Sequence, residues 1–98
     1  MNIAFDVDGT LIVPYGTTGS STDTPNYDVI AIFRWFQSQG HHMIIWSGSG
    51  TDYAKRWADK LGLQAEIRVK QKSADVDIAF DDMSGADLGN VNISVRWK

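Results

Sequence analysis

The chain has 98 residues, 43% of them hydrophobic and 21% charged, which is the composition of one compact domain. The net charge of −3 argues against broad, non-specific affinity for nucleic acid, because that affinity comes from lysine and arginine neutralising phosphates. There is no cysteine, which excludes disulfides, thiolate metal sites and cysteine nucleophiles. No apolar run approaches the ~18 residues that a membrane-spanning helix needs, and no secretory signal is visible. We therefore expect a single cytoplasmic domain over residues 1–98.

The first half of the chain predicts a strand, a loop and a helix. Residues 2–7 form a short apolar run that is typical of a buried strand, and 11–13 form a second, shorter one. Residues 16–25 are rich in Gly, Ser, Thr and Asp, which indicates a surface loop. Over 27–39 the apolar side chains recur at i, i+3, i+4 and i+7, so we expect an amphipathic helix that ends at Gly40.

The second half alternates strands with one more helix. Apolar runs predict strands over 42–46, 65–69, 76–80 and 91–95, and helical spacing predicts a helix over 52–61. Near-continuous apolar strands separated by amphipathic helices indicate an α/β fold. We expect a three-layer α/β sandwich with a mostly parallel sheet, covered on both faces and with the first strand central.

Two pairs of aspartates follow two of the predicted strands. Asp6 and Asp8 end the first, and Asp81 and Asp82 end the fourth. Either pair alone is more often a turn in which carboxylates cap backbone amides. In an open parallel sheet, however, ligands bind beyond the carboxyl ends of the strands, so both pairs are expected at one edge. Clustered carboxylates repel one another, and a hard cation such as magnesium or calcium relieves that repulsion.

The arrangement resembles the haloacid dehalogenase (HAD) superfamily of phosphohydrolases. Residues 5–11, Phe-Asp-Val-Asp-Gly-Thr-Leu, match the leading motif of the family over its full length. Residues 44–48 supply an apolar strand ending in a hydroxyl residue, and 78–82 supply the closing acidic motif. A lysine precedes that last motif. The resemblance implies a HAD-like, Rossmann-like sheet and a phosphatase that depends on Mg²⁺.

The resemblance also implies a role for each aspartate. Asp6 would attack phosphorus and form an aspartyl-phosphate, and Asp8 would act as general acid and then as general base. Magnesium would be held by Asp6, Asp8, Asp81 and Asp82, with Asp8 using its backbone carbonyl. Of the last two, Asp82 is preferred as the direct ligand, and Asp81 is expected to orient the lysine or a metal-bound water.

The remaining site residues would bind the phosphoryl group. Ser47 would donate a hydrogen bond to a phosphoryl oxygen, helped by the amide of Gly48, although a serine here can also simply cap the second helix. Lys72 would neutralise phosphoryl charge. It lies nine residues before Asp81 and is preferred to Lys70, which lies eleven before it. Taken alone, either lysine is more often a solvated surface residue than a site residue.

No cap domain is expected, because the insertion points of the family offer only residues 15–26 and 68–75. The open edge would suit a bulky phosphorylated substrate such as a nucleotide, a nucleic-acid end or a phosphoprotein. The acidic composition does not choose between these and a sugar phosphate. A small substrate could instead be enclosed by a second copy in a homo-oligomer.

Three alternatives remain open at this stage. The first is a phospho-accepting, receiver-like signalling domain, which uses similar residues but in another order along the chain. The second is a catalytically silent binding module that keeps the fold. The third is a phosphotransferase or a phosphonate-cleaving relative. The motif order, with Asp6 and Asp8 at the end of the first strand, argues against the first alternative, and the retention of both argues against the second. The missing cap and the presence of Asp8 argue against the third.

Overall fold

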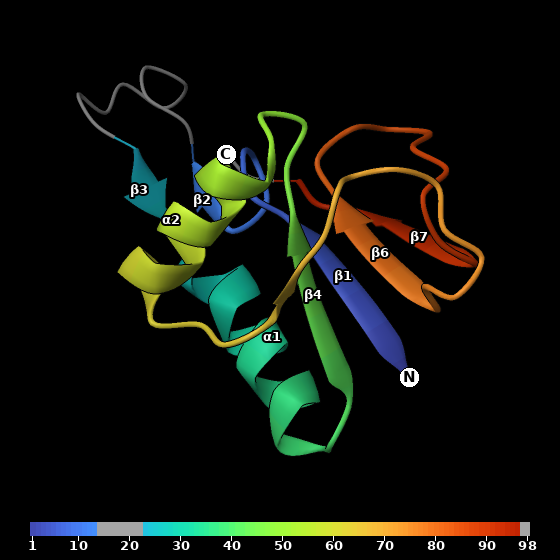
Figure 1. Ribbon diagram of the computed structural model, residues 1–98, viewed down its shortest axis with the longest axis horizontal. Helices are drawn as coiled ribbons and strands as arrows, with labels where there is room; N and C mark the ends of the chain where they lie inside the picture. Colours follow the sequence, from blue (N-terminus) through green and yellow to red (C-terminus); the bar gives the residue numbers. More distant parts are fainter. Residues whose placement is uncertain (14–22, 97–98) are drawn as a thin grey trace.

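The computed structural model describes residues 1–13 and 23–96. Five parallel strands form one sheet in the order β5–β4–β1–β6–β7 (Figure 1). The sheet strands are β1 (Asn2–Asp6), β4 (His42–Trp46), β5 (Glu66–Ile67), β6 (Ile78–Asp81) and β7 (Val91–Ser94), and the helices are α1 (Tyr27–Ser38) and α2 (Thr51–Leu61). The α/β class and the parallel sheet are thereby confirmed. Within the described ranges, no helix is long and apolar enough to cross a membrane.

Strand β1 lies at the centre of the sheet, as expected. It pairs with β4 over its whole length and with β6 over Ile3–Phe5. Its side chains alternate between the two faces, so Ile3 and Phe5 enter one apolar cluster and Ala4 enters another. All three are fully buried. A central strand buried on both faces explains why the run reads as continuously apolar in the sequence.

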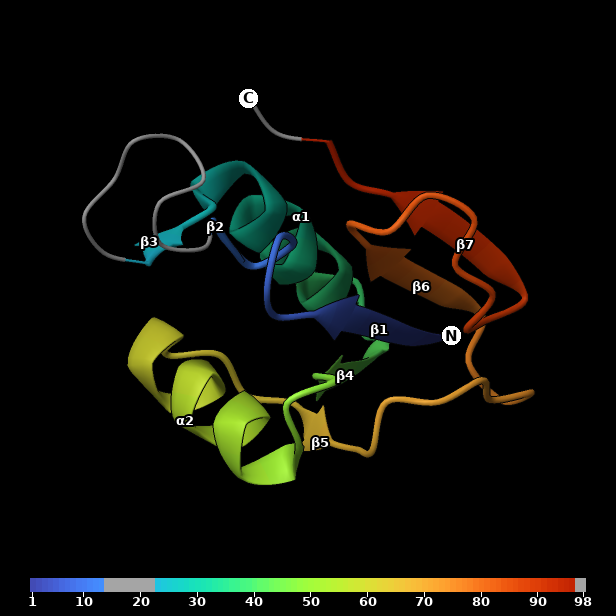
Figure 2. The ribbon, with the colours of Figure 1, turned by 90° about the horizontal axis from the view of Figure 1, so that it is seen from above.

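Both helices cover the same face of the sheet (Figure 2). Phe33 of α1, together with Ala54 and Ala58 of α2, packs into the cluster that contains Ile3 and Phe5. The chain passes from β1 through α1 to β4, and then through α2 to β5, moving in one direction across the sheet. Because such crossovers are right-handed, two steps in the same direction place their helices on the same face.

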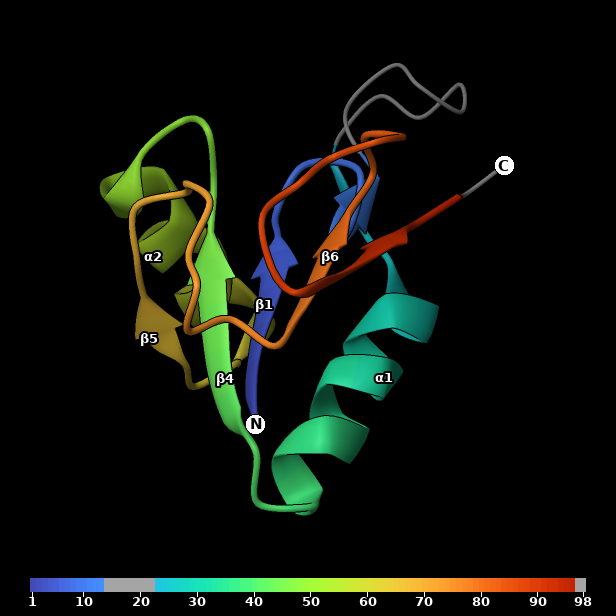
Figure 3. The ribbon, with the colours of Figure 1, turned by 90° about the vertical axis from the view of Figure 1, so that its right-hand side faces the viewer.

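The opposite face is covered by coil, so the expected three-layer sandwich is wrong for the described residues (Figure 3). The chain then crosses back from β5 to β6 and on to β7, which places these right-handed connections on the other face. Segments 68–77 and 82–90 supply them, and neither forms a helix. Val76 and Leu88 from these segments pack on Ala4, Ile44 and Trp46.

The reversal of direction defines where a ligand can bind. The chain leaves β1 toward the helical face and leaves β6 toward the coil face, so the two connections diverge beyond the carboxyl ends of these paired strands. This is the crevice in which open α/β sheets bind their ligands. Nearby, β2 (Ile12–Val13) pairs antiparallel with β3 (Thr24–Pro25). Most of the predicted 16–25 loop lies outside the described residues.

Candidate active site at the carboxyl edge of the sheet

Three carboxylates meet at the carboxyl ends of β1 and β6. One oxygen from each of Asp6, Asp81 and Asp82 lies within 4.8 Å of the others. Asp6 and Asp81 are 4% and 2% exposed, whereas Asp82 is exposed. Parallel pairing in register brings the ends of β1 and β6 together, which explains how residues distant in sequence form one cluster. Such a cluster of oxygen ligands can hold a metal ion.

The cation beside this cluster is Lys70. Its Nζ lies 3.1 Å from Oδ1 of Asp6 and 2.6 Å from Oδ2 of Asp81. Burial opposes the charged form of Lys70, but the hydrogen bond and charge of Asp81, together with Asp6, outweigh it and raise the pKa of the lysine. The ammonium therefore stays charged and compensates part of the negative charge in the crevice.

One lysine does not offset the whole cost of burying Asp6. Burial, followed by the charge of Asp81, raises the pKa of Asp6 from 3.8 to about 7, although Lys70 acts in the opposite direction. Burial and Asp81 also raise the pKa of Asp82. The site therefore carries more negative charge than its own cation neutralises, which is the condition under which a divalent cation binds favourably.

A tight turn after β1 brings Asp82 against the main chain. The turn is closed by hydrogen bonds from Ile12 N to Val7 O at 3.1 Å and from Gly9 N to Ile12 O at 2.8 Å. Gly9 has φ +79°, and a Cβ at this position would overlap the carboxylate of Asp82. Glycine is required here for both reasons, because it tolerates positive φ and leaves room for the acid.

Asp8 points to a different partner. Its Oδ1 accepts a hydrogen bond of 2.6 Å from the hydroxyl of Tyr53 on α2, and its carboxylate is not a member of the three-carboxylate cluster. Both residues are half-buried. In the sequence Tyr53 reads only as part of the apolar stripe of the second helix, so its polar contact was not predicted.

The loop between β4 and α2 presents Ser47 and Gly48 at the same edge of the sheet. Ser47 is 5% exposed, and its Oγ accepts a hydrogen bond of 3.0 Å from Ser49 N. Gly48 is exposed. The cap of α2, Gly50, makes no side-chain hydrogen bond to the first turn of the helix. The backbone N–H groups of that turn therefore keep hydrogen-bonding capacity, and the helix dipole favours an anion beside them.

The preference for Lys72 over Lys70 needs correction, because Lys72 lies away from the cluster. Its side chain is 73% exposed and pairs with Asp87 at 2.8 Å. Lys70 is the closer of the two to β5, which ends at Ile67, and it reaches back to Asp6 and Asp81. The number of residues between each lysine and Asp81 could not predict which lysine reaches the cluster. The segment between β5 and β6 is coil, so distance along the chain does not give distance in space.

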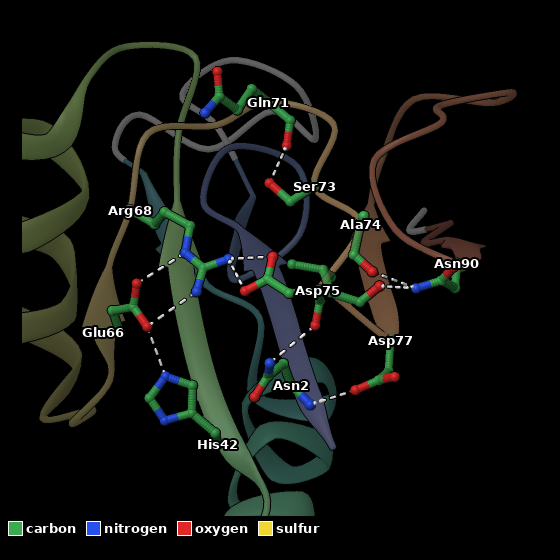
Figure 4. A network of polar contacts seen from close by, with 11 residues as sticks. Asn2, His42, Glu66, Arg68, Gln71, Ser73, Ala74, Asp75, Asp77 and Asn90 are labelled. Carbon is green, nitrogen blue, oxygen red and sulfur yellow. Dashed lines mark hydrogen bonds and ion pairs between the residues drawn. The ribbon is translucent and has the colours of Figure 1, made fainter.

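The coil that carries Lys70 is tied down by a polar network (Figure 4). Arg68 contacts Glu66 at 2.8 Å and Asp75 at 3.0 Å, and His42 contacts Glu66 at 2.7 Å. At the far end of the coil, Asp77 accepts a hydrogen bond of 2.7 Å from the backbone N of Asn2. The network joins β1, β4 and β5 to the segment 68–77, and so fixes the path of the coil on either side of Lys70.

The larger hollow of the surface does not coincide with the acidic cluster. A groove of about 690 Å³ lies between β3, α1 and β7, and none of the candidate site residues line it. A much smaller hollow of about 90 Å³ is lined by Asp81 and the following residues. The convergence of charged groups, rather than cavity size, therefore marks the candidate site.

No protein-family model, curated protein or solved structure matches this chain. Assignment of a function therefore depends on the motifs in the sequence and on the arrangement of the residues at the carboxyl edge. The structure brings Asp6, Asp81, Asp82 and Lys70 together.

Proposed function

We propose that this chain is a HAD-like, Mg²⁺-dependent phosphatase that hydrolyses phosphate monoesters through an aspartyl-phosphate on Asp6. The observation that carries the proposal is the cluster of Asp6, Asp81 and Asp82 with Lys70 against two of its members. This cluster lies at the carboxyl edge of a parallel sheet, where the residue order of the HAD signature predicts it. The sequence motifs and the geometry favour the same three aspartates, whereas Lys70 is favoured by the geometry alone.

In the first step, a carboxylate oxygen of Asp6 forms a bond to phosphorus as the bond between phosphorus and the leaving oxygen breaks. Asp8 gives a proton to that leaving oxygen. In the second step, Asp8 takes a proton from water while the water oxygen bonds to phosphorus and the bond to Asp6 breaks. Inorganic phosphate leaves and both aspartates return to their starting states.

The residues around the nucleophile would handle the charge of the phosphate. Lys70 holds Asp6 and offers a positive charge to the phosphoryl oxygens. Ser47, the amide of Gly48 and the first turn of α2 offer hydrogen-bond donors. When bound by Asp6, Asp81 and Asp82, Mg²⁺ would supply positive charge that lowers the repulsion between nucleophile and substrate. Hard carboxylate oxygens are the ligands that this ion prefers.

The proposal includes an open, capless site. The coil 68–77 between β5 and β6 packs along the sheet and forms no domain. The other insertion point of the family falls in the stretch bracketed by β2 and β3, much of which lies outside the described residues. An open edge favours a bulky phosphorylated group, such as a nucleotide, a nucleic-acid end or a phosphoprotein, over a small sugar phosphate.

The test is hydrolysis of a chromogenic aryl phosphate by the wild type and by Asp6→Asn, with and without Mg²⁺. We expect release that needs Mg²⁺ in the wild type and a loss of at least ~100-fold in the variant, the scale expected when a covalent nucleophile is removed. Asp77→Asn serves as control, since Asp77 holds the other end of the β1–β6 pair. Equal rates for wild type and Asp6→Asn would refute the assignment of the nucleophile.

A further inference from the structure

The side chain that holds Asp8 lies on the second helix. Tyr53 comes in the first turn of α2 and donates a 2.6 Å hydrogen bond to Oδ1 of Asp8, across 45 positions of sequence. At this distance the hydrogen bond is a short one for two oxygen atoms. It ties the helical face to the turn after β1 and leaves Oδ2 of Asp8 for other partners.

The direction of this hydrogen bond follows from the chemistry of its two groups. The phenolic hydroxyl of Tyr53 carries the proton, and Oδ1 of Asp8 accepts it. Trp57 lies one turn further along α2. Tyr53 and Trp57 both pack against the main apolar cluster, which limits the movement of both rings.

We propose that Tyr53 is the positioning residue of the reaction, holding Asp8 by Oδ1 so that Oδ2 faces the leaving oxygen of the substrate. This inference rests on the proposed phosphatase function. Removing the hydroxyl leaves the carboxylate free to rotate, and a misplaced proton donor is a slower one even when every reacting group is present. Within the described ranges, the hydroxyl of Tyr53 makes no hydrogen bond to Asp6 or Lys70 that this change would remove.

The effect of removing the Tyr53 hydroxyl on the rate should depend on the leaving group of the substrate. A phenolate with strongly electron-withdrawing substituents leaves without a proton, whereas an alkoxide needs one in the transition state. Tyr53→Phe should therefore lower kcat on an alkyl phosphate by roughly 10- to 100-fold, part of the range attributed to a general acid. On 4-nitrophenyl phosphate the loss should stay within ~3-fold, and KM should change little for either substrate, because binding of the phosphate is untouched.

The experiment compares wild type, Tyr53→Phe and Tyr27→Phe on both substrates with Mg²⁺. Tyr27 is 72% exposed at the start of α1, so its variant controls for loss of a tyrosine hydroxyl. Proton NMR supplies a readout that needs no turnover. A slowly exchanging hydroxyl proton at low field should be present in wild type and Tyr27→Phe, and absent from both Tyr53→Phe and Asp8→Asn.

The outcomes separate this inference from the function on which it rests. An equal loss on both substrates, or no loss on the alkyl phosphate, would overturn the role of Tyr53 and leave the phosphatase standing. Absence of the hydroxyl signal from the wild type would overturn it too. A wild type that hydrolyses neither substrate with Mg²⁺ would remove the proposed function, and the positioning role with it, whatever the NMR shows.

Discussion

Nζ of Lys70 lies 2.6 Å from Oδ2 of Asp81, and this contact joins the coil after β5 to the carboxyl end of β6. The aspartate side chain is 3% exposed and the lysine side chain 20% exposed. A buried carboxylate depends strongly on its partner, because removing one member of such a pair leaves an uncompensated charge. The pair therefore links the charge balance of the site to the path of the coil.

Substitution of the two lysines of this coil, Lys70 and Lys72, should lower activity to very different extents. Lys70→Met should lower kcat/KM on an aryl phosphate by ~100-fold or more, because a charged donor at a phosphoryl group is lost. Lys72→Met should stay within ~2-fold, since Lys72 is 73% exposed and pairs only with Asp87 among the described residues. Steady-state kinetics at saturating Mg²⁺ measures both. A larger loss for Lys72→Met would return the catalytic role to that residue.

Asp6 should make the metal-free protein less stable as pH rises. Its pKa is raised to about 7 by burial and Asp81, so the folded protein binds this proton more tightly than the unfolded chain does. The free energy of unfolding should therefore fall between about pH 4 and pH 7 and stay low above that. In EDTA at pH 8, Asp6→Asn should be more stable than wild type by roughly 1–3 kcal/mol, a discounted value for a shift of this size.

That advantage should disappear at about pH 3, below the unfolded pKa of 3.8, where Asp6 is protonated in both the folded and the unfolded state. Excess Mg²⁺ at pH 8 should stabilise the wild type more than Asp6→Asn, because a ligand that binds only the folded state raises its stability. Thermal unfolding followed by circular dichroism gives all three comparisons: in EDTA at pH 8, at low pH, and with Mg²⁺ at pH 8. A wild type that is more stable than the variant in EDTA at pH 8 would contradict the charge balance described for the crevice.

Gly9→Ala should disturb the cluster more than an equally strained substitution elsewhere. Gly9 and Gly40 have φ of +79° and +85°, so alanine is unfavourable at both. Only at position 9 would the new Cβ overlap Asp82; at position 40 nothing lies within 4 Å. We expect both variants to lose stability, roughly 1 kcal/mol from the backbone alone, and only Gly9→Ala to bind Mg²⁺ more weakly in isothermal titration. Equal affinities would show that Asp82 does not contribute to the metal site.

The network around Arg68 should stabilise the protein above a defined pH. Hydrogen bonds from Arg68 and His42 lower the pKa of Glu66 to about 2, so its contribution is present above about pH 4.5 and is lost as pH falls toward 2. Glu66→Gln should cost at most ~1 kcal/mol at pH 7, because the groups are partly solvated. Asp59→Asn, which breaks an exposed pair with Lys55, is the control and should cost less. A cost for Glu66→Gln that persists at pH 2 would argue against this ion pair.

The central place of β1 and both helices could be predicted from the sequence because their apolar patterns are strong. The run over 2–7 and the spacing over 27–39 each determine an element almost alone, and β1 and α1 follow them to within a residue or two. The layer on the second face could not be predicted in the same way. It depends on the direction in which the chain crosses the sheet, and on segments 68–77 and 82–90, whose polar composition has no regular period.

The candidate site likewise contains residues that could be predicted from the sequence and residues that could not. The aspartates could be placed because they follow strands directly, so the parallel register brings Asp6 and Asp81 together. Lys70 and Tyr53 could not, because one extends from an irregular coil and the other from a helix that packs against the turn only in the folded chain. Side chains that reach a site from such segments carry no signal in local spacing.

The central claim is that Asp6 is phosphorylated during turnover. The most direct measurement is acid quench of the wild type during hydrolysis of an aryl phosphate with Mg²⁺, followed by mass spectrometry of the peptides. We predict a phosphoryl group on the peptide that contains Asp6, and none in Asp6→Asn. A lasting adduct on Asp6 without release of phosphate would instead indicate a phospho-accepting domain. Hydrolysis with no label on Asp6, or with the label on another residue, would contradict the account.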